Sequence, residues 1–350
     1  MPIGSEEGSA QTPSGDQWDV YWSHGFVTSC ALAFSANYEG RMRGVWDEFF
    51  AELDAGARVL DICTGNGAIA IIANQCSRTA GKDFEIHGID RARVDPAAAL
   101  KADAALLAGI RFHPGMPAEH VGFPDRYFDA VTGQYALEYT DTAAAIGEIA
   151  RLLRPSGRWL FVLHHADSIV VETGREELRH ARLLFEETAL FDHGRDLLRC
   201  MGRATTPDER RALREDVEAE DRRQRLNAAA ADVSAAIGRS AHPEMLRTAL
   251  GHLSRAYRLL QEAGIEPALA LLTAAEREIR ANAERLQDLM RAARDAAAIE
   301  RLLAEMRQAG LSCAGAEPLY HDTEHGNRHL VGWLMRGHRT DRESCSEATG

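Results

Sequence analysis

The stretch "VLDICTGNGAIAI", residues 59–71, constrains the fold of this chain more than any other segment. An apolar run that contains Asp61 passes through a glycine-rich turn and continues into a second apolar, alanine-containing run. A buried strand, a tight turn and a helix explain that order, because glycine permits the turn and lets a ligand approach the backbone. Such a unit opens a parallel sheet that is covered by helices.

Strand-like and helix-like segments alternate after this unit. The sequence predicts strands at 58–63, 84–90, 110–115, 128–133 and 158–165, and helices at 68–78, 95–109 and 142–153. The segment Arg154-Pro155-Ser156-Gly157 is a helix stop signal. A helix at 298–311 and two strands at 312–321 and 329–338 end the pattern. We therefore expect an α/β fold with a Rossmann-like, doubly wound sheet.

A long helical block interrupts this alternation. Between 167 and 296, Ala, Arg, Glu and Leu dominate without any strand-like run. A helix start at 206–209 and breaks at 241–243 and 264–267 predict about four helices. The predicted domains are a disordered tail (1–16), a core (17–166 and 297–340), a helical insertion (167–296) and a second tail (341–350). The apolar face of the insertion is expected to pack against the core, against a second subunit in a homodimer, or around a carrier-bound substrate.

Composition excludes several classes of function. The net charge of −13 argues against a nucleic-acid-binding protein, which usually has a basic surface. The six cysteines are scattered without metal-ligand spacing, so we expect no metal and a reducing compartment. The first residues are acidic and small, and the longest apolar run near them is too short to span a membrane. These features predict a cytoplasmic protein with no membrane contact.

The glycine loop indicates which ligand the sheet holds. Gly65-x-Gly67-x-x-Ala70 fits the relaxed dinucleotide pattern, although a plain tight turn would also use these glycines. Asp61 disfavours a pyrophosphate at the loop and favours a ligand with a positive charge. Asp90, 23 residues after Gly67, can accept hydrogen bonds from ribose hydroxyls, or it can be an ordinary solvated residue. Together they predict a pocket for a ribonucleoside with a cationic amino-acid tail, whose carboxylate the helix N-terminus can hold.

At this point the chain resembles the class I S-adenosylmethionine-dependent methyltransferases, in their small-molecule branch. The resemblance rests on "VLDICTGNG", "GIDRA", "GMPAEHVGFPDRYFDAVTGQYALEY" and "LLRPSGRWLFV", and covers about 18–165 and 297–338. It implies S-adenosylmethionine as cofactor, a last strand that runs antiparallel, and an insertion that serves as a lid over the acceptor pocket or forms a dimer. The cofactor-binding residues that it implies are Tyr21, Asp61, Cys63, Thr64, Gly65, Gly67, Asp90, Arg91, Met116, Pro117 and Gln134.

One position departs from the family. Where its members commonly offer an Asp to the adenine amino group, this chain has Met116 or Pro117, so backbone groups and the packing of Met116 are expected to replace that contact. Tyr21 belongs to the aromatic stretch "WDVYWSHGF" and is a candidate for a lid over the cofactor or for a simple aromatic core patch.

The acceptor side is predicted from the ends of two strands. Tyr135 and Glu138 in "GQYALEY" are candidates to line it, or to pack and cap a helix. His164 and His165 end the predicted fifth strand, where at most one of them faces the site, as a general base or as a structural histidine. Tyr135, His164 and His165 are thus the catalytic candidates.

Three functions compete. The first is a methyltransferase for a small molecule, such as a secondary metabolite, modified at oxygen, nitrogen or carbon. The alternatives are a protein or peptide methyltransferase and a catalytically silent scaffold with the methyltransferase fold. An NAD(P) oxidoreductase is disfavoured, because Asp61 would face the pyrophosphate.

Overall fold

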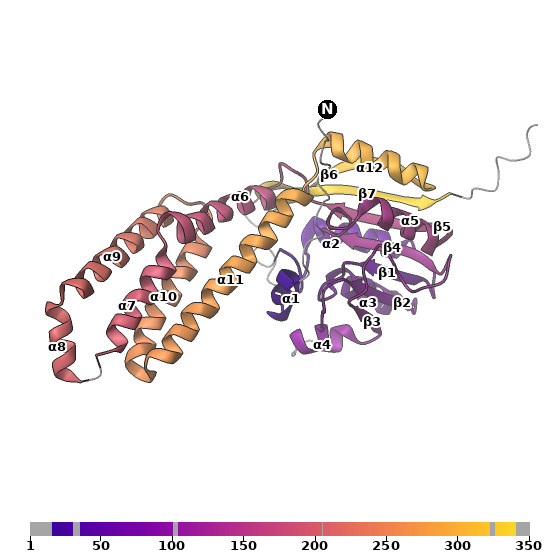
Figure 1. Cartoon of the computed structure of the whole chain (residues 1–350). Coiled ribbons are helices and arrows are strands. Elements are labelled where there is room, and N and C mark those ends of the chain that lie inside the picture. Colours follow the sequence, from indigo (N-terminus) through magenta and orange to yellow (C-terminus); the bar gives the residue numbers. More distant parts are fainter. Residues whose placement is uncertain (1–15, 31–35, 101–103, 205, 323–325, 341–350) are drawn as a thin grey trace, which may run out of the picture.

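The computed structural model describes residues 16–30, 36–100, 104–204, 206–322 and 326–340. In these residues a seven-stranded sheet is covered by helices, and a helical arm projects away from it (Figure 1). The order of the strands is β3-β2-β1-β4-β5-β7-β6. The predicted doubly wound α/β fold is therefore confirmed. The tails expected at 1–16 and 341–350 lie outside the described residues, apart from Asp16.

Five parallel strands form the main part of the sheet, and two antiparallel strands complete it. β1 is Arg58–Ile62, β2 Glu85–Asp90, β3 Ile110–Pro114, β4 Phe128–Gln134 and β5 Leu153–Leu163. β7 (Arg328–Arg339) pairs antiparallel with β5, and β6 (Leu311–Asp322) pairs antiparallel with β7. The strand order reverses at β1, whose neighbours are β2 and β4. In such sheets a ligand binds at the carboxyl ends of the strands next to the reversal.

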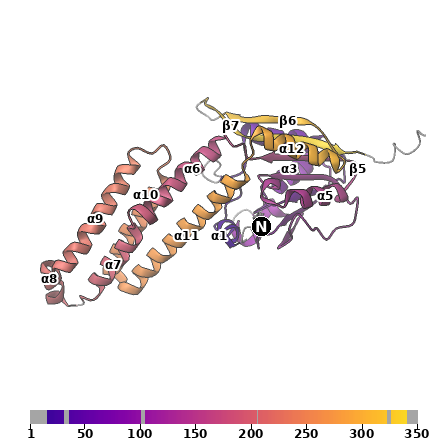
Figure 2. The ribbon, with the colours of Figure 1, turned by 45° about the horizontal axis from the view of Figure 1, so that its top comes forward.

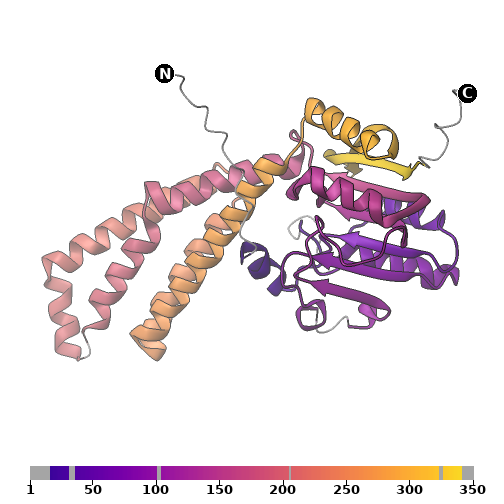
Figure 3. The ribbon, with the colours of Figure 1, turned by 45° about the vertical axis from the view of Figure 1, so that its right-hand side comes forward.

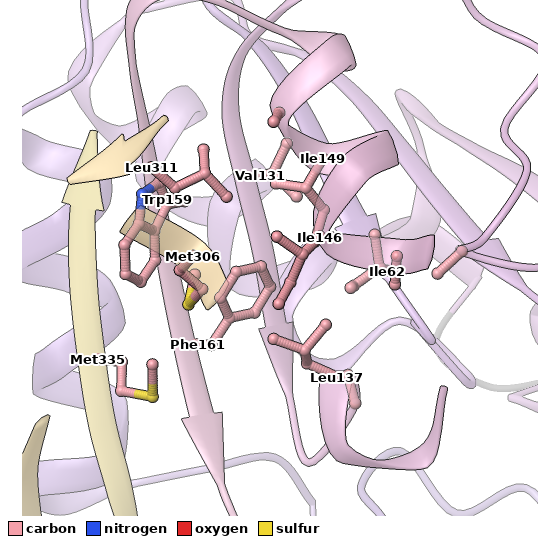
Figure 4. Close-up of a cluster of buried hydrophobic side chains, with 14 of the residues drawn as sticks. Ile62, Val131, Leu137, Ile146, Ile149, Trp159, Phe161, Met306, Leu311 and Met335 are labelled. Atoms are coloured by element: carbon pink, nitrogen blue, oxygen red, sulfur yellow. The ribbon is translucent and has the colours of Figure 1, made fainter. Parts of the chain in front are cut away.

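Apolar side chains bury both faces of the sheet. The helices of the core are α2 (Gly40–Ala51), α3 (Ala68–Ala80), α4 (Pro96–Ala99), α5 (Thr142–Leu152) and α12 (Ala296–Gln308), with 3-10 turns η1 (Ala104–Leu107) and η2 (Leu137–Tyr139). One buried cluster joins α2 and α3 to the sheet. The other joins α5 and α12 to it, where Ile146 and Met306 meet Phe161 of β5 (Figure 4). These two layers hold the strand ends in fixed positions.

The fifth strand differs from the prediction at both ends. It begins at Leu153, so the stop signal 154–157 lies within it, and it ends at Leu163, before His164 and His165. The pairing jumps from Phe128↔Leu153 to Ala130↔Arg158, and Ser156 has a φ of +60°. The turn residues therefore bulge out of the strand while the chain on both sides stays paired with β4.

The segment 169–292, which we call the helical arm, lies between β5 and α12. It contains α6 (Ile169–Arg182), a π-helical turn η3 (Leu183–Glu187), α7 (Leu190–Gly202), α8 (Pro207–Glu215), α9 (Val217–Ile237), α10 (Glu244–Ala263) and α11 (Ile265–Ala292). The sequence predicted about four helices, and the described residues form six. The additional breaks occur at Ala189, which has a φ of +45°, and at Asp216, whose extended backbone caps α9.

The arm has its own hydrophobic core and joins the sheet domain through α6 and α11 (Figures 1 and 2). The short helix α1 (Asp16–Ser23) lies beside α11, between the arm and the strand ends (Figure 3). The chain thus brings its N-terminal helix and the last arm helix to the edge of the sheet where the glycine loop lies.

Candidate functional site

A pocket lies at the carboxyl ends of β1, β2 and β4. Its volume is about 930 Å³ when the open solvent at its mouth is included. α1 and the segment after it contribute to one wall, and the strand ends contribute to another. The lining residues are Trp18, Trp22, Val27, Thr28, Ser29, Tyr38, Asp61, Cys63, Thr64, Ala68, Ile69, Asp90, Arg91, Ala92, Ala118, Glu119, Gln134, Tyr135, Tyr139 and Thr140.

The glycine loop requires its glycines. Gly65 and Gly67 have φ angles of +54° and +90°, which L side chains rarely adopt. A Cβ on Gly65 would lie 2.4 Å from the Trp22 ring, and one on Gly67 would lie 2.8 Å from Phe112. Gly67 precedes α3 without a side-chain cap, and the first α3 residues line the pocket. The helix end can therefore receive an anionic group, while the two glycines lie beneath aromatic rings.

Asp61 supplies a negative charge beneath the loop. The side chain is only 1% exposed and accepts hydrogen bonds from Thr64 Oγ1 at 2.5 Å and Thr132 Oγ1 at 3.1 Å. Burial raises the pKa of Asp61 to about 7. No arginine or lysine in the described part of the chain forms an ion pair with it. A cationic ligand would stabilise this carboxylate and lower its pKa.

Asp90 joins the second strand to the loop. Its Oδ2 accepts from Gly65 N at 2.8 Å, and its Oδ1 accepts from Ala92 N at 2.8 Å. Burial raises the pKa of Asp90 to about 6. Each carboxylate oxygen can accept a second hydrogen bond, so Asp90 keeps capacity for ligand hydroxyls while it fixes the loop.

Gln134 has a fixed orientation at the end of β4. Its Oε1 accepts from Trp46 Nε1 at 2.6 Å, and because an indole N–H only donates, the amide nitrogen must lie on the other side. Nε2 is buried without a hydrogen-bond partner among the described residues, and so is Oε2 of Glu119. Both residues line the pocket. An orphaned donor and an orphaned acceptor fit a polar ligand such as S-adenosylmethionine, whose carboxylate and amino groups could pair with them.

The structure places some of the remaining cofactor-binding candidates in the pocket lining and others outside it. Cys63, Thr64 and Arg91 line the pocket with Asp61, Asp90 and Gln134. The other five, Tyr21, Gly65, Gly67, Met116 and Pro117, are not among its lining residues. Met116 packs against the core and its N–H donates to Asp90 O at 2.8 Å, so it supports the strand end from outside the pocket.

The catalytic candidates are also divided. Tyr135 lines the pocket with a φ of +53°, and its hydroxyl donates to Val331 O at 2.9 Å. His164 stacks on Tyr135 with ring centres 3.8 Å apart, and burial lowers its pKa to about 3. His165 stacks on Trp333 at 4.3 Å, and its Nδ1 accepts from Asp167 N. Neither histidine is among the lining residues, so a general-base role stays a prediction.

Glu138 is likewise not among the lining residues. It is buried and accepts from His164 N at 2.7 Å, and burial raises its pKa to about 7. Its position therefore fixes the segment that follows β5.

Sequence reasoning missed the residue that holds α1 and the segment after it against the glycine loop. Asn66 is fully buried, and its Nδ2 donates to Trp22 O at 2.9 Å and to Phe26 O at 2.8 Å. Its place between the two loop glycines was the available signal. Four further aromatic residues line the pocket, namely Trp18, Trp22, Tyr38 and Tyr139. The aromatic N-terminal stretch of the sequence indicated only the first two.

α1 is also held from the arm (Figure 3). Gln17 Nε2 donates to Asp288 Oδ2 at 2.6 Å, and the Arg285 guanidinium lies 4.8 Å from the ring centre of Tyr21. The Tyr21 hydroxyl donates to Thr28 O at 2.8 Å. α1 and the segment after it are therefore held between the glycine loop and α11.

Two features are absent from the described ranges. None of the helices there is both long and apolar enough to cross a bilayer. In the same part of the chain, no three His, Cys, Asp or Glu side chains group as metal ligands.

Known methyltransferases are similar to this chain in sequence. A sequence model described as "Methyltransferase domain" matches residues 34–214. The chain is 34% identical over 119 residues to the methyltransferase YcgJ of Bacillus subtilis (strain 168), which covers 33% of the chain and 44% of that relative. It is 32% identical over 127 residues to the ubiquinone/menaquinone biosynthesis C-methyltransferase UbiE of Stutzerimonas stutzeri, which covers 35% of the chain and 48% of that relative. The chain thus spans about half the length of the curated relatives it matches.

Several solved structures also match parts of this chain. The YcgJ structure from Bacillus subtilis has a TM-score of 0.36 at 16% identity and covers 85% of this chain and 98% of its own. An S-adenosylmethionine-dependent methyltransferase from Mesorhizobium loti has a TM-score of 0.29 at 19% identity, with 36% and 55% covered. The matched sequence model ends at residue 214, before most of the arm and the last two strands.

Proposed function

The chain belongs to the methyltransferase domain family, and from this premise we propose that it is an S-adenosylmethionine-dependent enzyme that methylates a small molecule. The observation that carries the proposal is the set of aromatic side chains that line the pocket. Trp18 and Trp22 of α1 line the pocket, and Tyr38, Tyr135 and Tyr139 add three further aromatic side chains. An aromatic chamber of this kind suits a flat or apolar molecule better than a polypeptide segment.

The cofactor end of the pocket is proposed from its charges. When bound, S-adenosylmethionine supplies an electrophilic methyl group on a positively charged sulfur. Asp61 would lie toward the cationic part of the cofactor, and Asp90 would accept from the ribose hydroxyls. The N-terminus of α3 would receive the carboxylate of the tail. The orphaned amide of Gln134 supports a second polar contact at this end.

The acceptor end is proposed at Val27, Thr28, Ser29, Tyr38 and Tyr135, which line the pocket. Apolar and aromatic side chains, together with the aliphatic hydroxyl groups of Thr28 and Ser29, suit a neutral, flat acceptor. Curated relatives are named as C-methyltransferases of ubiquinone and menaquinone biosynthesis, and those names support a small organic acceptor.

Catalysis is proposed to rest on positioning. In-line methyl transfer gains most from holding the two reactants in alignment, and it needs a base only when the acceptor must lose a proton. With a pKa of about 3, His164 stays neutral near pH 7, and its stacking contact fixes the ring of Tyr135. Tyr135 in turn forms part of the wall against which the acceptor would lie.

The surroundings of the enzyme are proposed from weaker features. We place it in the cytoplasm because the described cysteines, among them Cys30, Cys63 and Cys76, are unpaired. Beyond its contact with α1, the arm would serve a homodimer or a covering role. Nucleic acid is not proposed as a partner, given the net charge of −13.

Two measurements test the proposal. Calorimetric titration with S-adenosylhomocysteine, beside NAD in a matched run, should give binding of the first alone. Transfer of a labelled methyl group from S-adenosylmethionine into a cell extract, separated by size, should then label the small-molecule fraction. Label in the polypeptide fraction would instead support the protein methyltransferase, and binding without any transfer would support the silent scaffold.

Variants make the second measurement specific. Tyr38→Ala should lower transfer to the small-molecule fraction without changing the affinity for S-adenosylhomocysteine. Tyr320→Ala removes a tyrosine that is 37% exposed on β6 and stacked against Arg328, outside the pocket, and should leave both unchanged. Equal transfer by the two variants would exclude the proposed acceptor end.

A further inference from the structure

Glu119 lies in the wall of the pocket with its two carboxylate oxygens in different surroundings. Oε1 accepts from Arg91 Nη2 at 2.7 Å and from Asp141 N at 2.9 Å. Oε2 is buried and has no hydrogen-bond partner in the described ranges. A buried acceptor without a donor is unfavourable unless a ligand supplies that donor. The side chain is therefore held by one oxygen and left with the other available.

Its neighbours place Glu119 beside the proposed ribose contact. Arg91, which holds Oε1, directly follows Asp90 at the end of β2, and all three residues line the pocket. The segment that leads to Glu119 is tied to the same strand end, since Met116 N donates to Asp90 O at 2.8 Å. A base attached to a ribose at Asp90 would come within this group of residues, next to Ala92 and Ala118.

We infer that Glu119 Oε2 accepts a hydrogen bond from the exocyclic amino group of the cofactor's adenine. Adenine presents an N–H donor there, and a carboxylate oxygen is a strong acceptor for it. The contact would replace the acidic residue that the chain lacks at Met116 and Pro117. This inference rests on the proposed function, because it requires the cofactor in this pocket.

The inference predicts a change of specificity on one substitution. In Glu119→Gln the amide oxygen must remain where Oε1 accepts from two N–H groups, so the amide nitrogen takes the place of Oε2. The pocket then offers a donor where it offered an acceptor. S-Inosylhomocysteine, in which a carbonyl oxygen replaces the amino group of S-adenosylhomocysteine, should fit that donor and oppose the native carboxylate.

Calorimetric titration of both nucleosides into the full chain provides the test. The wild type should bind S-adenosylhomocysteine about tenfold or more tightly than S-inosylhomocysteine, on the scale of one charge-assisted hydrogen bond. Glu119→Gln should reduce that ratio about tenfold or reverse it.

Glu148→Gln is the matched control. Glu148 Oε1 also accepts from a backbone N–H, that of Val121 at 2.7 Å, and from an arginine, Arg151, but both of its oxygens are partnered and it lies outside the pocket lining. This variant should keep the wild-type ratio.

The outcomes separate the two proposals. If the wild type binds both nucleosides equally, or Glu119→Gln keeps the wild-type ratio, the assignment of Glu119 is overturned while the cofactor site stands. If the wild type binds neither nucleoside, the proposed function fails together with the inference.

Discussion

The buried carboxylate of Asp61 lowers the stability of the fold but favours binding of a cationic ligand. Asp61→Asn should therefore raise the stability and weaken the binding. The side chain is 1% exposed and receives two threonine hydrogen bonds. No cationic partner for it exists among the described residues. Burial raises its pKa from an ordinary 3.8 to about 7. The ligand-free fold therefore favours the protonated acid, whereas a cationic cofactor would favour the carboxylate.

The magnitude follows from the two pKa values. The difference between 3.8 and about 7 corresponds to about 4 kcal/mol, since one unit is about 1.36 kcal/mol. Between these values the folded chain keeps a proton that the unfolded chain has released, so the free energy of unfolding falls as the pH rises. The full penalty is present above the folded value. Asparagine has no charge to bury, and a threonine hydroxyl can accept from its amide, so we expect a gain of about 2–4 kcal/mol at about pH 8.

Urea unfolding at about pH 8 and about pH 5 measures this gain. Less than half of it should remain at the lower pH, because only part of the titration window has then been crossed. Asp129→Asn is the control, since Asp129 has an ion pair with Arg154 and a hydrogen bond from Arg58 N, so its substitution should destabilise the protein. An Asp61→Asn variant that is no more stable than wild type at pH 8 would refute the reasoning. The same variant should bind S-adenosylhomocysteine more weakly.

Three further variants test other parts of the site. Gly65→Ala would place a methyl group 2.4 Å from the Trp22 ring at a φ of +54°, so melting temperature and S-adenosylhomocysteine affinity should both fall; unchanged values would mean that α1 does not pack as described. Trp46→Phe removes the donor that orients Gln134, so calorimetry should give an affinity lower by roughly three- to tenfold, and wild-type affinity would exclude the amide contact. His164→Phe keeps a flat ring on Tyr135, so it should retain most of kcat where His164→Ala does not; equal loss in both, with a changed pH profile, would restore the histidine as a base.

The sheet was predictable because its strands carry local signals. Each central strand is buried on both faces and reads as a short apolar run, and the glycine loop identifies which strand comes first. The fifth strand was misplaced at both ends. Its start depends on a bulge at Ser156 that only pairing with β4 stabilises, and nothing local marks Leu163 as its last residue.

The candidate site was predictable where residues follow the strand ends directly. Asp61, Asp90 and Gln134 lie in the pocket for that reason. Trp18 and Glu119 line it through tertiary contacts, and no spacing in the sequence shows that a side chain will meet a partner far along the chain. The extra breaks in the arm were hidden similarly, because Ala189 is a good helix former with a left-handed backbone.

The arm is the part of this chain whose length we expect to vary most easily. Among the described helices of the arm, α6 contacts β7 and α11 contacts α1 and η2, while α7, α8, α9 and α10 pack mainly against each other and against α6 and α11. Helices that contact neither the strand ends nor α1 can be shortened, lengthened or replaced without moving Gln17 or Arg285. We therefore expect the distal arm to be interchangeable, a place where variants of one enzyme can acquire new surfaces while the chemistry stays constant.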